Sequence, residues 1–327
     1  MKNTKISWCD HTFNPWIGCT KVSPACDNCY AEQIASRFKM AQWGNHKRVL
    51  TSEKNWKQPL RWNKQAIKEG KRFKVFCGSM CDVFDNQAPF AWRLQLFTLI
   101  QNTPSLDWLL LTKRIGNAKK MLDNIMWFHK INGHLDNVCL GITVCNQEEA
   151  DRDIPKLLSI PAAKHFLSIE PMLGYVDLSK WLKPQCDNGS IPSIDGTYGV
   201  MCPRCQGNGP SCSGIDWVIV GGETGRNARY LHPECVRVIR DQCKATGTAF
   251  FFKQWGEYVP YEWHAQPPYI YSQHGDLFDA HGLPDFESDE PKNGWLCDDT
   301  NEVFFRRVGE KKAGYLLDCV EYQEVPA

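Results

Sequence analysis

The sequence predicts an α/β protein built on a parallel (β/α) barrel, closed or partial, of six to seven units. Three observations predict this fold. Short and almost continuously apolar runs recur along the chain, helix-like stretches separate them, and polar or glycine-containing turns follow them. Such runs are typical of strands buried on both faces of a parallel sheet, and their alternation with helices is typical of βα units. A doubly wound open sheet is the alternative that this alternation leaves open.

The elements are predicted in the following order. The first strand is expected near residues 13–18, and the later strands are expected at residues 74–79, 108–112, 138–144, 165–169, 217–221 and 248–252. Helix-like stretches lie between these runs, at residues 29–39, 89–101, 115–130, 147–158 and 233–246. The alternation breaks at residues 180–215, which are rich in Gly, Pro, Ser and Cys and are predicted to form an insertion.

The chain of 327 residues is long enough for one large barrel with insertions or for two ordinary domains. We expect residues 1–255 to form the barrel, residues 180–215 to form a Cys-rich metal-binding insertion in it, and residues 256–327 to form an acidic extension packed on it. Hydrophobic residues make up 43% and charged residues 23%, which are values of a soluble globular protein. No stretch approaches the ~20 apolar residues of a membrane helix, and the N-terminus lacks the apolar run of a signal peptide. A cytoplasmic location is therefore expected.

Polar residues follow the predicted strands at the points where the strands end. In parallel α/β barrels these carboxyl ends converge on one mouth, and catalysis takes place there. Their regular placement after apolar strands indicates one shared site. The residues concerned are Ser79, Asp82, Lys113, Arg114, Thr143, Asn146, Glu170, Glu223 and Lys253.

Sixteen cysteines are many for a chain expected in a reducing compartment, where metal binding or catalysis explains them better than disulfides do. Cys19, Cys26 and Cys29 follow the first predicted strand, with six residues between the first two and a CxxC pair at the end. Three thiolates are suited to three corners of a cubane iron–sulfur cluster, which leaves one iron open. A structural zinc site, with Cys9 or another residue as its fourth ligand, is the alternative that the spacing leaves open.

A second group of cysteines lies within the predicted insertion and consists of Cys186, Cys202, Cys205 and Cys212. The segment CPRCQGNG contains a CxxC pair followed by glycines, which let a backbone turn tightly around a metal. Four thiolates would complete a tetrahedral structural zinc site. A second iron–sulfur cluster is the runner-up, and free thiols in a loop are the third possibility.

Charge is unevenly distributed, although the net charge is only +1. Residues 37–74 contain twelve Lys/Arg and two Glu, a balance of +10, whereas residues 256–327 contain five Lys/Arg and fifteen Asp/Glu, a balance of −10. The basic segment also carries Phe38, Trp43, Trp56, Trp62 and Phe73. Basic residues interleaved with aromatic ones suit a nucleic acid. A solvated helical surface paired with the acidic extension is the alternative.

Several blocks resemble a family of phage and bacterial proteins of unknown function, with a three-cysteine motif, that is grouped with radical S-adenosylmethionine (SAM) enzymes. The blocks cover most of the chain in order: NPWIGCTKVSPACDNCYAE (14–32), VFCGSMCDVF (75–84), LLLTKR (109–114), LGITVCNQEEADRDIP (140–155), LSIEPMLG (167–174), DWVIVGGETG (216–225), FFFKQWGEY (250–258) and GEKKAGYLLDCVEYQEVP (309–326). Two features depart from the expected pattern. Most radical-SAM enzymes have three residues between the first two cysteines, and other residues are expected in place of Cys77 and Cys81, which argues against these two as cluster ligands.

The resemblance implies a [4Fe–4S] cluster held by Cys19, Cys26 and Cys29, SAM bound at the open iron, and an electron donor such as flavodoxin or ferredoxin. It also implies a cavity lined by Ser79, Asp82, Lys113, Glu170, Glu223 and Lys253. Within this cavity, Ser79 and Asp82 are expected near the methionyl group of SAM, and Glu170 and Glu223 near the ribose or substrate. Lys113, Arg114 and Lys253 are expected to hold an anionic group of SAM or substrate.

The leading hypothesis is therefore a radical-SAM enzyme that generates a 5′-deoxyadenosyl radical to modify a nucleic acid or nucleotide. A second hypothesis keeps the enzyme but makes a peptide or small metabolite its substrate. A third is a zinc-stabilised α/β binding protein without catalysis.

Overall fold

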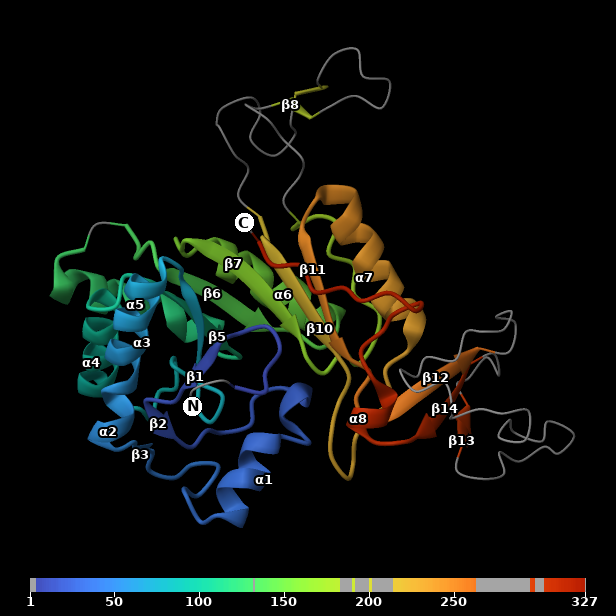
Figure 1. Cartoon of the computed structure of the whole chain (residues 1–327), viewed down its shortest axis with the longest axis horizontal. Coiled ribbons are helices and arrows are strands. Elements are labelled where there is room, and N and C mark those ends of the chain that lie inside the picture. Colours follow the sequence, from blue (N-terminus) through green and yellow to red (C-terminus); the bar gives the residue numbers. More distant parts are fainter. Residues whose placement is uncertain are drawn as a thin grey trace, which may run out of the picture.

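A seven-stranded parallel sheet that curls as part of a barrel forms the centre of the fold (Figure 1). Its strands lie side by side in chain order: β1 (His11–Phe13), β4 (Phe73–Cys77), β5 (Leu106–Thr112), β6 (Val138–Thr143), β7 (Lys164–Ile169), β10 (Trp217–Gly221) and β11 (Ala249–Gln254). All neighbouring strands are parallel. A doubly wound sheet would reverse its strand order at a switch point, so that alternative is wrong. The sheet agrees with the predicted partial barrel.

The computed structural model describes residues 4–131, 133–182, 190–191, 200–201, 214–262, 295–297 and 303–326. Within the predicted insertion, β8 (Ser190–Ile191) and β9 (Val200–Met201) form an antiparallel pair. The cysteines predicted to bind zinc, Cys186, Cys202, Cys205 and Cys212, lie outside the described residues. Their zinc site stays a prediction.

Helices lie between most of the strands along the chain, and several of them flank the sheet (Figure 1). They are α1 (Tyr30–Arg37), α2 (Glu53–Trp56), α3 (Gln58–Glu69), α4 (Phe90–Gln101), α5 (Ile115–His129), α6 (Gln147–Leu158), α7 (Pro233–Thr246) and α8 (Glu310–Ala313), with a 3-10 turn, η1 (Pro24–Cys26). The bounds of α6 and α7 match the predicted ones. None of the described helices is long and apolar enough to cross a membrane.

The prediction of one strand at residues 13–18 is wrong. The chain instead leaves the sheet after β1, and β2 (Trp16–Ile17) pairs in antiparallel fashion with β3 (Val49–Leu50). Pro15 lies between the two strands, and its missing N–H prevents a continuous ladder. The crossover to β4 then runs through α2 and α3, two helices that were not predicted from the sequence.

The sheet is buried on both faces, which explains its nearly continuous apolar strands. Outward-facing residues pack under the helices and include Val75, Leu110, Ile142, Leu167 and Val218. Inward-facing residues form a second, mainly aromatic cluster with Trp8, made of Phe76, Leu109, Phe166, Trp217, Ile219 and Phe251. The interior of the partial barrel is therefore a packed core and not a channel.

Trp8 fills the interior from the N-terminal segment that precedes β1. Its ring centroid lies 4.7 Å from that of Phe76, 6.2 Å from that of Trp217 and 6.5 Å from that of Phe166. Aromatic pairs at such separations contribute about 0.5–1.5 kcal/mol each beyond the burial of their area. One side chain thus joins strands β4, β7 and β10 across the concave face.

Gly141 on β6 makes room for this aromatic cluster. A Cβ atom at this position would lie 2.4 Å from the ring of Phe166 on the neighbouring strand. The ring therefore lies directly over the backbone of β6, and any side chain here would displace it.

We expect Gly141→Ala to lower the free energy of unfolding by about 1–3 kcal/mol, because the added methyl group overpacks the interior. The lower melting temperature should be measured by thermal unfolding. Gly116→Ala is the control, since a Cβ atom at Gly116 meets no atom within 4 Å. Adding Phe166→Leu to Gly141→Ala should restore part of the lost stability. Equal melting temperatures for Gly141→Ala and Gly116→Ala would contradict this packing.

The chain returns to the barrel after a three-stranded antiparallel sheet, in which β14 (Val303–Arg307) lies between β12 (Tyr258–Glu262) and β13 (Trp295–Cys297). Residues 320–326 then run along the edge strand β11, where the Phe252 N–H donates to the Tyr322 carbonyl at 2.9 Å. This segment covers hydrogen-bonding groups that an edge strand otherwise exposes.

Asp318 fastens the same segment to α7. Its carboxylate accepts from Arg237 at 2.8 Å and from Arg240 at 2.6 Å. Burial alone would raise the pKa of Asp318, but the two guanidinium groups outweigh it and hold the pKa below its ordinary value.

A carboxyl group with a lowered pKa in the folded state stabilises the fold above its unfolded pKa, and this contribution is lost as the pH falls through the folded value. We therefore expect Asp318→Asn to be less stable than wild type near neutral pH, with a difference that shrinks below about pH 4. Thermal unfolding from about pH 7 to pH 2 measures this difference. Asp241→Asn, which removes an exposed partner of Arg240, should have little effect. A stability difference for Asp318→Asn that does not change with pH would contradict the assignment.

Candidate functional site

The cysteine loop, which we define as residues 18–29, lies across the carboxyl ends of the strands. It contacts the β5 end where Arg114 donates to Cys19 Sγ at 3.3 Å, and the β10 end where Asn28 donates to Glu223 at 2.9 Å. Ser23 interacts with Cys145, which follows β6. Directly after the loop, the Tyr30 hydroxyl donates to the carbonyl of Ser79 beyond β4, at 3.1 Å. These contacts join segments that are far apart in the sequence.

Gly18 sets the path on which the loop begins. Its φ of +112° is strained for residues with a side chain, and a Cβ atom here would lie 3.1 Å from Cδ of Arg48. Its N–H donates to the Met80 carbonyl at 3.0 Å, and Gly18 forms an isolated parallel bridge with Cys81. The loop is thus attached to the segment after β4 before the chain reaches Cys19.

Cys19 lies in a charged pocket beneath the loop. The pKa of its thiol is raised to about 11, mainly by burial and also by the Asp82 carboxylate, while the guanidinium of Arg114 acts in the opposite direction. The Arg114 side chain is only 10% exposed, and it also donates to the Thr20 carbonyl at 2.6 Å. The thiol is therefore held by a buried cation.

Asp82 is engaged by the protein itself. Its carboxylate accepts from the Thr112 hydroxyl at 2.8 Å, from the Lys113 N–H at 3.0 Å and from the Phe84 N–H at 2.9 Å. Arg114 approaches the same carboxylate at 3.5 Å. Asp82 thus orders the turn after β5, from which the side chains of Lys113 and Arg114 start.

A second ion pair lies next to this one. Arg48 and Asp85 are in contact at 2.7 Å, and both side chains are almost fully buried. Arg93 is also buried and donates to the carbonyls of Val83 and Asp85. Buried charges are costly unless they are paired, so the segments that carry these residues are held firmly together.

Glu170 and Lys253 meet across the inner face of the sheet, from the ends of β7 and β11. Their carboxylate and ammonium groups lie 2.5 Å apart. Burial alone would lower the pKa of Lys253, but the charge of Glu170 outweighs it and raises the pKa. Gly221 on the strand between them supplies the space, since a Cβ atom there would lie 3.2 Å from the Glu170 carboxylate.

Glu223 holds the far end of the cysteine loop. The Arg229 side chain donates two hydrogen bonds to the Glu223 carboxylate, at 2.7 and 2.9 Å, and the Arg229 backbone N–H donates a third at 2.9 Å. The same guanidinium donates to the Pro24 carbonyl at 3.0 Å. Burial would raise the pKa of Glu223, but the hydrogen bonds from Arg229 and Asn28 outweigh it and lower the pKa. The end of β10 and the loop are thus connected by charge-assisted hydrogen bonds.

The sequence-predicted residues occupy the carboxyl ends of the strands as follows: Ser79 and Asp82 after β4, Lys113 after β5, Glu170 after β7, Glu223 after β10 and Lys253 at the end of β11. The Ser79 hydroxyl accepts from Asn14 at 3.0 Å. Lys113 is half-buried, and its ammonium has no hydrogen bond or ion pair with the described residues. Thr143 Oγ1, on the inner face at the end of β6, is buried and likewise has no hydrogen-bond partner in the described part of the chain.

Cys19, Cys26 and Cys29 are all free thiols in the structure. Cys29 is the N-cap of α1, and Cys26 ends η1. The described residues contain no group of three or more Cys, His, Asp or Glu side chains that could hold a metal ion. A single zinc ion with bonds of about 2.3 Å needs its sulfurs about 3.8 Å apart. Thiolates on a cubane cluster bind different irons and therefore lie farther apart.

Three residues of the site were missed or assigned otherwise from the sequence. Asn28 and Arg229 carried no signal, because only the folded chain brings them to Glu223. Arg114 was expected at an anionic group, and the structure places its guanidinium on Cys19. The stretch TKR gave no means of telling which of its two cations turns toward the loop.

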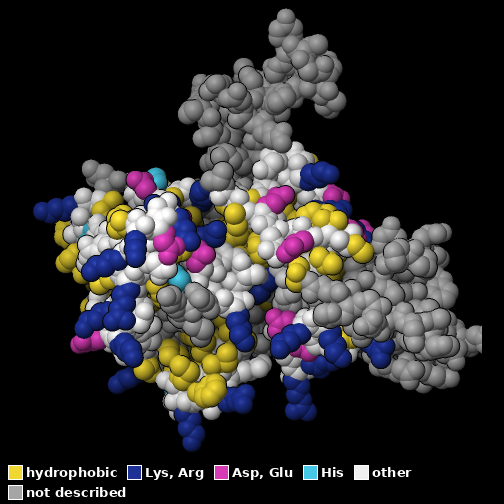
Figure 2. Space-filling model, in the orientation of Figure 1, with side chains coloured by type: hydrophobic (Ala, Val, Ile, Leu, Met, Phe, Trp, Pro, Cys, Tyr) yellow, Lys and Arg dark blue, Asp and Glu magenta, His cyan; other side chains and the backbone are white. Residues whose placement is uncertain are grey.

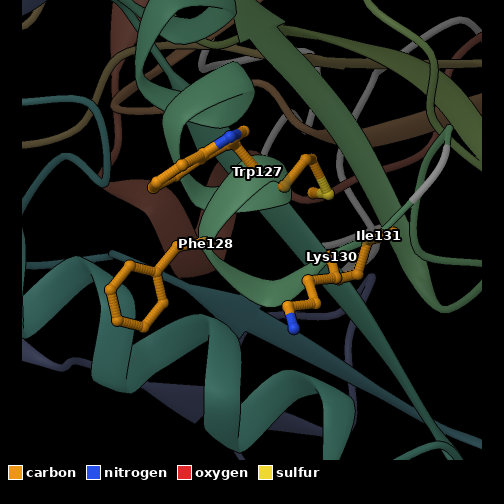
Figure 3. Close-up of a pocket in the computed structure, with 5 residues that line it drawn as sticks. Trp127, Phe128, Lys130 and Ile131 are labelled. Carbon is orange, nitrogen blue, oxygen red and sulfur yellow. The ribbon is translucent and has the colours of Figure 1, made fainter.

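A separate hollow lies at the end of α5, beside Trp127, Phe128, Lys130 and Ile131 (Figure 3). It has a volume of about 490 Å³. Helix α5 begins at the carboxyl end of β5 and ends near the opposite edge of the sheet, so this hollow is remote from the strand ends. In parallel α/β barrels the site lies at the carboxyl edge, and we therefore place the candidate site beneath the cysteine loop.

The fold and the site define a partial parallel α/β barrel with a cysteine-bearing loop across its carboxyl edge. The chain belongs to the family described as "Protein of unknown function (DUF5131)", which it matches over residues 3–326. No curated protein and no solved structure matches it significantly. Membership in a family of unknown function is thus confirmed, and the grouping of that family with radical-SAM enzymes stays a prediction.

We expect Glu223→Ala to release the far end of the cysteine loop, because Asn28 and Arg229 lose a charged acceptor. A charge-assisted hydrogen bond is worth about 1.5–3 kcal/mol, so amide hydrogen exchange in residues 19–29 should accelerate by roughly tenfold or more, while exchange in the central strands stays unchanged. Glu148→Ala, on the exposed face of α6, is the control. Unchanged exchange in the loop would show that Glu223 does not anchor it.

Proposed function

We propose that this chain is a radical-SAM enzyme in which Cys19, Cys26 and Cys29 hold a [4Fe–4S] cluster. The observation that carries the proposal is the position of the cysteine loop over the carboxyl edge of a partial parallel α/β barrel, where catalysis takes place in such folds. When bound, such a cluster supplies the electron that cleaves SAM to a 5′-deoxyadenosyl radical. An electron donor such as flavodoxin or ferredoxin would deliver that electron.

The donor set fits such a cluster. All three thiols are free, and their thiolates would bind iron. Cys19 accepts a hydrogen bond from Arg114, and Cys29 is the N-cap of α1.

The polar residues beneath the loop are proposed to bind SAM or substrate. Lys113 has an ammonium group that no described residue engages, and it suits the carboxylate of SAM or a phosphate. Ser79 lies on the turn that Tyr30 contacts and is proposed to face the methionyl group. Glu170 and Lys253 form a ready pair of acceptor and donor for the ribose or substrate.

Two further residues predicted from the sequence, Asp82 and Glu223, are proposed to act indirectly, by holding other residues in place. Asp82 would act by ordering the turn that carries Lys113, since its oxygens already accept from Thr112 and from backbone N–H groups. Glu223 would act by holding the loop through Arg229 and Asn28. Structural zinc at the second cysteine group remains part of the proposal.

We further propose a nucleic acid, or a nucleotide, as the class of substrate. The supporting observation is the exposed basic face of α2 and α3, where dark blue side chains gather in Figure 2. Lys54, Arg61, Lys64 and Lys68 are exposed there, and none has an ion pair with a described residue. Unpaired cations in a row attract phosphates and release their counterions.

Three of the five aromatic side chains in the basic segment are not available for stacking on bases. Trp56, Trp62 and Phe73 are buried in the main core, with Trp62 only 2% exposed. They pack between α3 and the sheet and offer no ring to a base. Of the five aromatic residues in the segment, Phe38 is exposed and Trp43 is half-buried. Contacts with phosphates, not base stacking, therefore support the proposed surface.

The cluster proposal predicts that the anaerobically reconstituted chain contains iron and sulfide. Its reduced form should show a cubane electron paramagnetic resonance signal that changes when SAM is added. Serine at any of Cys19, Cys26 or Cys29 should remove most of the iron, whereas Cys235→Ser, a half-buried cysteine on α7, should keep it. Zinc alone at the three cysteines would favour the non-catalytic binding protein.

The substrate proposal predicts salt-sensitive binding of DNA or RNA, measured by fluorescence anisotropy. Replacing Arg61, Lys64 and Lys68 by glutamine should weaken binding at least tenfold at low salt and reduce the salt slope by about 0.9 per lost phosphate contact on duplex DNA. The matched control replaces Lys244, Lys311 and Lys312, which are exposed on α7 and α8. Arg48 is unsuitable as a probe because it is buried against Asp85.

Equal binding of nucleic acid by both triple variants would show that the basic face of α2 and α3 is not the contact surface. A wild-type chain with a cluster but no affinity for nucleic acid would favour a peptide or small metabolite as substrate. These outcomes leave the cluster proposal untouched.

A further inference from the structure

Contacts within the protein hold Arg114 at Cys19. This arginine is the N-cap of α5, and its own N–H donates to the Thr112 hydroxyl at 2.8 Å. The guanidinium donates one hydrogen bond to the Thr20 carbonyl, at 2.6 Å, and another to Cys19 Sγ, at 3.3 Å. With its side chain 10% exposed, it has little freedom to turn toward solvent.

One cation faces the sulfur of Cys19. A guanidinium nitrogen of Arg114 lies 3.3 Å from Cys19 Sγ and 3.5 Å from the Asp82 carboxylate. Arg48, the neighbouring buried cation, is instead paired with Asp85 at 2.7 Å. Arg114 is therefore the positive group that an anionic cluster bound through Cys19 would meet.

We propose that Arg114 is a positioning residue that raises the reduction potential of the cluster through its hydrogen bond to Cys19 Sγ. This inference rests on the proposed function. Reduction adds one electron and hence one negative charge to the cluster. A fixed cation and an N–H···S hydrogen bond stabilise the reduced state more than the oxidised state, which moves the potential to more positive values.

This role differs from the one that the sequence suggested, in which Arg114 held an anionic group of SAM or substrate. The geometry points to sulfur, because both terminal nitrogens of the guanidinium already have acceptors in the cysteine loop. Lys113, the neighbouring cation without a partner in the described residues, remains available for the anionic group. The two roles make different predictions for the potential and for the response to SAM.

The test is a redox titration of the full-length, anaerobically reconstituted chain, followed by electron paramagnetic resonance, with iron content measured alongside. Arg114→Met removes both charge and donors, Arg114→Gln keeps a donor without charge, and Arg114→Lys keeps the charge. We expect more negative midpoint potentials for Arg114→Met and Arg114→Gln, and a smaller shift for Arg114→Lys. Lys21→Met removes an exposed loop cation that pairs with Glu32 and should leave the potential unchanged.

The possible outcomes distinguish failure of the cluster proposal from failure of the role assigned to Arg114. A wild-type chain without iron and sulfide overturns both the cluster and this inference. A wild-type cluster whose potential is the same in Arg114→Met overturns the inference alone. Loss of the SAM-induced spectral change at an unaltered potential would instead assign Arg114 to SAM. Loss of iron in all three variants, with the fold intact by circular dichroism, would show that Arg114 serves assembly and not the potential.

Discussion

A partial barrel has a concave face that no second sheet covers, and the rest of the structure depends on how this face is filled. Trp8 and the aromatic residues of four strands occupy it from the amino side. Gly141 lacks a side chain so that the ring of Phe166 can lie over β6, and Gly221 lacks one so that Glu170 can approach Lys253. The filled concave face leaves space for polar groups only at the carboxyl edge of the sheet. The ion pairs and the cysteine loop come together at this edge.

Elements with strong local signals were predicted well from the sequence. Helix α6 starts where the Asn146 side chain caps the N–H of Glu149 at 2.9 Å, and α7 ends at Gly247, which adopts the left-handed conformation. The N-terminal strand was not predicted correctly, because Pro15 divides it. The burial of Trp56 and Trp62 could not be predicted either, since it depends on their packing against Phe13 and His11 of β1 and not on the neighbouring lysines.

The candidate site, like the fold, could be predicted from the sequence only in part. Its place at the strand ends could be predicted, because parallel strands in chain order bring their carboxyl ends to one edge. The partners within it could not be predicted, because they depend on the path of the loop. Arg114 and Cys19 are 95 residues apart, and Asn28 and Glu223 are 195 residues apart. Such long-range contacts leave no periodicity or spacing in the sequence, and only the side-chain geometry decides that Arg114, not Lys113, turns toward the sulfur.

The indole of Trp217 is a meeting point for segments from the two extremes of the chain. Its ring lies edge-on to Trp8, with centroids 6.2 Å apart, and its N–H donates to the Glu324 carbonyl at 2.9 Å. Contacts this distant in sequence form slowly, because large loops must close first. During synthesis, the concave face therefore stays incomplete until β10 has emerged, and the edge of β11 stays open until the final segment arrives. Over that interval the nascent chain would present aromatic surface and an unpaired strand edge, and both features favour aggregation.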